Sequence, residues 1–267
     1  MKRLFILYLG AFVPESTSAS DAFQLRDIRS FALAEIVASL SSYSNPSALS
    51  LTPARTFSLS YENRFMTREL STYAAAFSQP TPWVDLSVVV SRYGYEDYHE
   101  TKCGLNVGKL LGNGFSLGVR FLFFNMDYVD NEDPVNVFSA DVGLQYQPVD
   151  NLLLGVLVSN PFGITYKRSD ERYDLPVTFS VGLRYTLIPQ CNLWMEGEKS
   201  SDTPFCWKGA AEYEIMEALR LRLGILSSPW MPTFGVGYRM GKLSFDVAGA
   251  WHPVLGISPG IGISFTL

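Results

Sequence analysis

The feature that most constrains the fold is a strict alternation of side-chain types near the C-terminus. Across residues 233–267, apolar or aromatic side chains alternate with small, polar or charged ones. In the last run, Ile261 and Ile263 fall on one face, and Gly262 and Ser264 fall on the other. Successive side chains of a strand point to opposite faces of a sheet, so this periodicity predicts β-strands. A single apolar face fits a half-buried soluble sheet, and it also fits a membrane barrel with lipid outside and a polar interior.

The same alternation recurs from residue 56 onward and divides the chain into about fourteen strands of roughly 8–12 residues, a length that crosses a bilayer at a tilt. Short connections alternate with longer ones, and the short ones all fall on one side of the predicted sheet, at 79–82, 111–114, 148–151, 188–191, 216–218 and 240–242. The longer connections, of which the charged stretch 160–174 is the longest, fall on the other side. An even strand number with this division is typical of an outer-membrane barrel whose short turns face the periplasm.

Aromatic side chains make up 14% of the chain and cluster near the two ends of the predicted strands. On the short-turn side we expect a girdle of Phe77, Trp83, Tyr146, Tyr185, Tyr213, Tyr238 and Phe265. On the long-loop side we expect a second girdle of Tyr61, Tyr93, Phe124, Trp207, Trp230 and Trp251. Amphipathic rings favour the headgroup level of a bilayer, whereas a soluble β-sandwich or propeller gives no reason for two aromatic levels. The sequence therefore predicts an all-β fold, a transmembrane antiparallel β-barrel of about fourteen strands.

The N-terminus has the layout of a secretory signal peptide. Lys2 and Arg3 precede an apolar run at 4–13, and small residues at 16–20 follow, so we expect cleavage after Ser20. The alternative, a membrane anchor, needs a longer apolar run. Beyond this region no apolar run is long enough for a membrane helix, which excludes a helical membrane protein. We therefore expect export, and localisation in the outer membrane of a Gram-negative cell.

The stretch between the signal and the strands lacks the period of two. Its first half suggests a short helix or packed coil, and its second half is rich in Ser, Pro and Asn, which is loop chemistry. A barrel of about fourteen strands is too wide to be filled by its own side chains. We therefore expect a signal peptide at 1–20, an N-terminal plug segment at 21–53 and the outer-membrane β-barrel at 54–267.

Charged side chains on the polar face of the strands are expected to line the lumen around this plug. The residues so placed are Arg120, Asp141, Arg184, Glu212, Arg220, Arg222, Arg239 and Asp246. Both signs occur in this set, so we expect ion pairs that stabilise the interior rather than a selectivity ring of one sign. The whole chain has a formal net charge of −5, which argues against nucleic acid as a partner.

Catalytic and metal sites have little support in the sequence. A Ser/His/acid enzyme needs a nucleophile motif, and none surrounds the serines that could lie near the loop residues His99 and His252, namely Ser227, Ser228 and Ser258. An acidic loop could bind calcium through oxygen ligands, but it lacks the spacing of a dedicated calcium loop; it contains Asp127, Asp130, Asn131, Glu132 and Asp133. We expect a solvated loop, no enzymatic activity, no cofactor and no metal.

The three cysteines are an odd number for an oxidising compartment. Cys191 falls at one end of the predicted barrel and Cys206 near the other, so these two are not expected to pair. With only two histidines in the chain and no CxxC spacing, a structural zinc site is not indicated. We expect Cys103, Cys191 and Cys206 to be small apolar residues without a bond.

Residues 47–54 read SALSLTPA and directly precede the first predicted strand. They resemble the S-A-x-x-x-N-P-A signature that opens barrels of the PorV/PorQ family, with Thr52 where the family usually has Asn. The matching residues, which form the predicted plug motif, are Ser47, Ala48, Thr52, Pro53 and Ala54. The final strand also resembles the outer-membrane assembly signal, with Leu267 in place of the usual aromatic. That family is itself similar to FadL-type transporters.

The resemblance implies two different functions for an outer-membrane barrel. In the first, the protein is an accessory or scaffold in protein secretion or surface attachment, as in type IX secretion, and its partners are secretion-system proteins. In the second, it is a FadL-like transporter that moves hydrophobic small molecules across the outer membrane, and its partner is a hydrophobic ligand. Outer-membrane lipids surround the protein in both. The small size and modest loops of the chain favour the accessory role slightly.

Overall fold

The computed structural model describes residues 25–40, 43–128, 134–168 and 171–267. The predicted signal peptide at 1–20, the start of the predicted plug segment and residues 129–133 of the acidic loop lie outside these ranges. Within the described ranges, no helix is long and apolar enough to cross a membrane.

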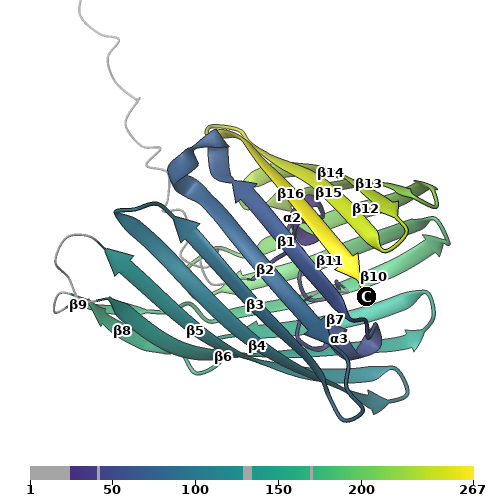
Figure 1. The fold of residues 1–267 in the computed structure, drawn as a ribbon, viewed down its shortest axis with the longest axis horizontal. Helices are drawn as coiled ribbons and strands as arrows, with labels where there is room; N and C mark the ends of the chain where they lie inside the picture. The colour runs from purple at the N-terminus through teal and green to yellow at the C-terminus, as the bar shows by residue number, and fades with distance from the viewer. Residues whose placement is uncertain (1–24, 41–42, 129–133, 169–170) are drawn as a thin grey trace, which may run out of the picture.

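Strands close into one antiparallel barrel, in which each pairs with the barrel strands before and after it and β1 joins β16 (Figure 1). The barrel strands are β1 (Thr56–Asn63), β2 (Ser71–Gln79), β3 (Asp85–Gly94), β4 (Tyr98–Gly112), β5 (Phe115–Tyr128), β6 (Val135–Val149), β7 (Leu152–Ser159), β10 (Thr178–Ile188), β11 (Cys191–Ser200), β12 (Cys206–Met216), β13 (Leu219–Ser227), β14 (Trp230–Met240), β15 (Leu243–His252) and β16 (Gly256–Thr266). The predicted fourteen-stranded antiparallel barrel is therefore confirmed.

Alternation along these strands gives the barrel an apolar outer face. On β13, Leu221 and Leu223 are exposed, whereas Arg222 between them is buried. Because the ring is closed, strand backbones find their hydrogen-bond partners within the sheet, which is the condition for strands to lie in a bilayer. The alternating side chains therefore form an apolar outer face that is compatible with lipid and a polar inner face.

The predicted division into short and long connections holds only in part, because residues 228–229 alone join β13 to β14 at the long-loop end, whereas residues 80–84 join β2 to β3 at the short-turn end. The tight turns between β2 and β3, β4 and β5, β6 and β7, and the later hairpins lie at one end, near the C-terminus (Figure 1). Two short 3₁₀ helices, η1 (Arg64–Met66) and η2 (Arg68–Leu70), join β1 to β2 at the other end. The longest connection there holds a separate two-stranded sheet of β8 (Thr165–Arg168) and β9 (Glu171–Asp174). The sequence predicted only a loop, because such short strands show no readable period.

Two aromatic side chains expected in the outer girdle, Tyr93 and Phe124, instead lie on the inner face. Phe124 is 1% exposed and belongs to a buried cluster, whereas the preceding Phe123 pairs with the exposed Phe138 outside. Tyr93 shares the face of the fully buried Val89. Both residues lie near the predicted end of their strands, but the alternation of side chains along each strand places them on the inner face of the barrel.

The N-terminal segment, here residues 25–40 and 43–53, packs against the inner side of the barrel wall, and Figure 1 shows its short helices surrounded by strands. Helix α2 (Ile28–Ala32) contacts β13 to β16 and β1. Helix α3 (Ala48–Leu51) contacts β3, β4 and β5 on the opposite side. Helices this short are not stable alone, so packing against the wall must hold them.

Glycines in the wall let the backbone of this segment lie directly against the strands. A Cβ added at Gly143 of β6 would lie 1.9 Å from Asn45 Oδ1. One at Gly155 of β7 would lie 2.0 Å from the Ala38 carbonyl oxygen. Both distances are far below van der Waals contact, so a larger residue would displace the segment. Glycine inside a strand often marks such a close approach of another backbone.

Candidate functional site

The N-terminal segment is bound to the wall by buried charged side chains. Glu196 of β11 accepts hydrogen bonds from the backbone N–H groups of Val37, at 3.0 Å, and Ala38, at 2.7 Å. Lys208 of β12 donates to the Glu35 carbonyl at 3.0 Å, and its Nζ lies 3.4 Å from Glu196 Oε1. A buried charge is tolerated only when it is paired and hydrogen-bonded, and both of these charges meet that condition.

A second group of charges forms around Glu212. Its carboxylate lies between Arg29 of α2, at 2.8 Å, and Arg222 of β13, at 2.7 Å. Arg222 also pairs with Asp246 of β15. Strands β12, β13 and β15 and helix α2 therefore contribute to one alternating set of charges, in which Glu212 bonds both arginines.

A third contact involves Arg120 of β5 and Asp141 of β6, which face each other across the strand pair. Arg120 Nε lies 3.0 Å from Asp141 Oδ2, and Arg120 Nη2 donates to the Ser44 carbonyl at 2.6 Å. Both side chains are almost fully buried. The segment is thus tied to β5 as well as to β11–β13.

The structure brings together five of the eight charged residues that the sequence placed in the lumen. Arg120 lies with Asp141, and Glu212 lies with Arg222 and Asp246. The remaining three lie elsewhere: Arg220 pairs with Glu214 at 2.9 Å, Arg239 is exposed, and Arg184 is half-buried.

Glu196, which binds the segment most directly, is absent from the set of lumen residues predicted from the sequence. On β11 the 1% exposed Trp194 places a large ring on the inner face, which obscures the alternation. Once β11 is read with its inner face bearing Trp194, Glu196 and Glu198, the strand alternates like the others. The signal that the sequence offers is the pair Glu196 and Glu198, two carboxylates spaced by two residues on one face of the strand.

The motif at residues 47–54 lies where the segment joins β1. Ser47 donates its hydroxyl to Asn45 Oδ1 at 2.8 Å, and Asn45 Nδ2 donates to the Ala38 carbonyl at 2.8 Å. Thr52 bonds back to the Ala48 carbonyl at 3.3 Å, at the end of α3. An amide from Asn45, outside the motif, therefore holds the two halves of the segment together.

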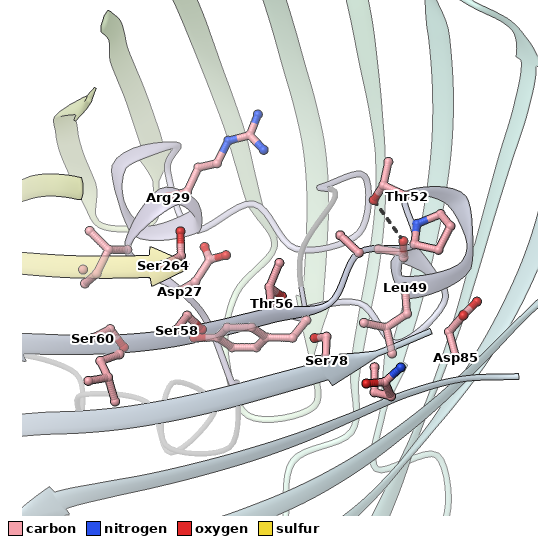
Figure 2. Close-up of a pocket in the computed structure, with 18 of the residues that line it drawn as sticks. Asp27, Arg29, Leu49, Thr52, Thr56, Ser58, Ser60, Ser78, Asp85 and Ser264 are labelled. Atoms are coloured by element: carbon pink, nitrogen blue, oxygen red, sulfur yellow. Dashed lines mark hydrogen bonds between the residues drawn. The ribbon is translucent and has the colours of Figure 1, made fainter. Parts of the chain in front are cut away.

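A cavity of about 380 Å³ lies at the short-turn end, between the segment and strands β1, β2 and β16 (Figure 2). Hydroxyl groups of Ser58, Ser60, Ser78 and Ser264 line it, and Asp27 adds a carboxylate. Burial raises the pKa of Asp27 above its ordinary value, and the backbone N–H that its side chain accepts offsets part of that rise. Apolar side chains, among them Ile28, Leu49 and Leu86, complete the lining, so the cavity has a mixed polar and apolar surface.

An apolar cluster lies at the opposite end of the lumen. This buried cluster joins the inner faces of β5 and β6 to the long loop after β7, and its members are Phe124, Met126, Val135, Val137 and Leu175. Ile164 and Tyr166 of the same loop pack against it. We call this set the mouth cluster. It lies at the end where the long connections emerge, away from the cavity.

The histidine and serine considered for catalysis have other partners. His252 Nδ1 accepts the Val254 and Leu255 N–H groups, and the Ser258 hydroxyl accepts the Phe65 N–H. In the part of the chain that the structure describes, no three metal-binding side chains are grouped, and all three cysteines are free.

No protein-family model matches the chain, and no curated protein sequence matches it either. Solved structures match its fold. The CymD monoaromatic hydrocarbon channel aligns with a TM-score of 0.65 at 10% identity, over 89% of this chain and 96% of that one. A Pseudomonas aeruginosa FadL homologue aligns at 0.63 and 11% identity, over 91% and 98%. The Pseudomonas putida toluene transporter TodX aligns at 0.63 and 11% identity, over 89% and 96%. The fold is that of FadL-type channels.

The FadL-type half of the sequence resemblance is thus confirmed at the level of fold. The three neighbours are a channel, a FadL homologue and a transporter, so none favours an enzyme. None is named as a secretion component, and the PorV/PorQ likeness of residues 47–54 stays a prediction. The same holds for the signal peptide at 1–20.

Proposed function

We propose that the protein is an outer-membrane channel through which hydrophobic small molecules pass, and that the N-terminal segment acts as its plug. The fold supports this proposal, because the similar structures include a monoaromatic hydrocarbon channel and a toluene transporter. The accessory role in secretion has no comparable support.

The mouth cluster is the observation in this chain that carries the proposal. Phe124, Val137 and Leu175 form a buried apolar cluster inside the outer end of the barrel, and displacement of the loop after β7 would turn it into an apolar surface. Ligand sites for apolar molecules are concave and lined mainly by hydrophobic and aromatic side chains. An apolar molecule would leave water at this surface before it meets the charged part of the lumen.

The buried ion pairs support the role of the segment as a plug. Lys208, Glu196 and Glu212 bond the segment rather than face an open channel. Ions would therefore meet paired charges and packed backbone. An uncharged molecule would need only a local displacement of the segment, toward the cavity at the short-turn end.

Uptake across an intact outer membrane tests the proposal. The protein is produced in a Gram-negative host that lacks its own channel for hydrophobic compounds, and uptake of radiolabelled toluene is compared with that of the empty host. We expect faster uptake with the wild-type protein. Val137→Asp places an unpaired charge in the mouth cluster at a cost of several kcal/mol, so uptake should fall more than about tenfold.

Asn136→Asp is the matched control, because it adds the same charge one residue away on the exposed outer face. Its uptake should equal that of the wild type. Heat-modifiable gel mobility confirms that each barrel is folded. Wild-type protein that is folded in the outer membrane, yet leaves toluene uptake at the empty-host rate, would refute a channel for this class of compound.

A further inference from the structure

A chain of buried polar contacts joins the long outer loop to the N-terminal segment. Its outer end is Asn160, the first residue after β7, which adopts a positive φ of 51°. Asn160 Nδ2 donates to the Leu175 carbonyl at 2.9 Å, and Asn160 Oδ1 accepts the Ile164 N–H at 3.2 Å. One side chain therefore holds both ends of the loop that covers the mouth cluster.

Asp141 and Arg120 continue the chain inward. Asp141 Oδ1 accepts the Asn160 N–H at 3.2 Å, and Asp141 Oδ2 lies 3.0 Å from Arg120 Nε. Arg120 Nη2 then donates to the Ser44 carbonyl at 2.6 Å. Exposure is 6% for Asn160, 4% for Asp141 and 2% for Arg120, so water cannot readily replace any of these partners.

The two halves of the N-terminal segment are anchored differently. Residues 26–38 bond charged groups on the far wall, as Ala38 does with Glu196. Ser44, in contrast, takes its charged contact from Arg120, whose partner Asp141 also holds the outer loop. Asn45 and Tyr43 bond the carbonyls of Ala38 and Arg26, but the Val37 and Ala38 N–H groups are held separately by Glu196. A disturbance of the loop should therefore affect residues 43–52 more strongly than residues 26–38.

We propose that Arg120 and Asp141 couple the outer loop to the second half of the N-terminal segment, so that displacing the loop loosens residues 43–52. Buried polar networks are most stable when every member is satisfied, and loss of one partner weakens the rest. This coupling does not require a ligand. That it serves the passage of a molecule through the barrel rests on the proposed function. Displacement at the mouth would then open the way to the cavity.

Hydrogen–deuterium exchange of the purified full-length protein in detergent tests the coupling. Asn160→Gly removes the side-chain bonds and keeps a residue that tolerates positive φ. We expect faster exchange in the loop and also in residues 43–52, by roughly 5- to 150-fold, the usual range for coupled sites. Exchange in residues 26–38 should rise much less, because Glu196 still holds the Val37 and Ala38 N–H groups.

Asn113→Gly is the matched control, because Asn113 also has a φ of 51° but lies in the exposed turn between β4 and β5. It should alter neither region. Asp141→Asn removes the ion pair with Arg120 in the middle of this set of polar contacts. It should speed exchange in residues 43–52 as much as the double variant Asp141→Asn/Asn160→Gly does. Barrels are checked by heat-modifiable mobility.

The proposal would be overturned if Asn160→Gly speeded exchange in the loop but not in residues 43–52. It would also be overturned if the two substitutions raised the exchange of residues 43–52 equally and their effects added in the double variant. Toluene uptake is measured separately. A barrel that shows the coupled exchange but no uptake would keep the coupling and reject the channel, so the two failures are distinguishable.

Discussion

Lys208 is a residue at which the energetics of the interior can be measured directly. Its ammonium group is buried and bonds Glu196, Glu198 and the Glu35 carbonyl. Lys208→Met would leave two carboxylates without their cation, so we expect the free energy of unfolding to fall by about 3–5 kcal/mol. Urea unfolding followed by tryptophan fluorescence measures this loss.

Lys199→Met is the control for that substitution. Lys199 lies on the exposed outer side of the adjacent strand β11 and bonds only a loop carbonyl, that of Thr203, in the contacts described for it. Its replacement should change the free energy of unfolding by less than about 0.5 kcal/mol. Equal unfolding midpoints for the two variants would mean that the buried charges contribute no net stability.

At the scale of elements, the contact between β6 and the N-terminal segment depends on a missing side chain. Gly143→Ala would place its Cβ 1.9 Å from Asn45 Oδ1, so we expect a loss of about 1–3 kcal/mol and faster proteolysis within the segment. Gly209→Ala on β12 is the control, since its Cβ would meet nothing closer than 3.9 Å. Identical proteolysis of both variants would contradict the tight fit.

Elements were predictable from the sequence where they repeat and unpredictable where they do not. Barrel strands and tight turns follow from local alternation, and Arg120 and Asp141 follow from the pairing of one hairpin. The contacts of Arg120 with Ser44 and of Glu196 with Ala38 join residues far apart in the chain, so no local pattern encodes them. Helix α3 and strands β8 and β9 are too short to show a period.

At the scale of the whole molecule, we expect the N-terminal segment to block the lumen of the barrel. Its residues 32–34 and 36–38 are fully buried, and its contacts run from β1 and β3 around to β16. Deleting residues 25–53 would remove this packing and uncover the charged inner faces of β11–β13. A closed barrel of this strand number is wide enough for water to pass when nothing fills it.

We therefore expect the deletion variant to conduct ions in a planar lipid bilayer at a level far above the wild-type protein. The variant must first show heat-modifiable mobility, since loss of the segment also removes the partners of Glu196 and Lys208. Adding Glu196→Gln and Lys208→Met to the deletion removes the two charged groups that lose these backbone hydrogen bonds and gives a second barrel to measure. Folded deletion barrels that conduct no better than the wild type would mean that the wall, not the segment, closes the lumen.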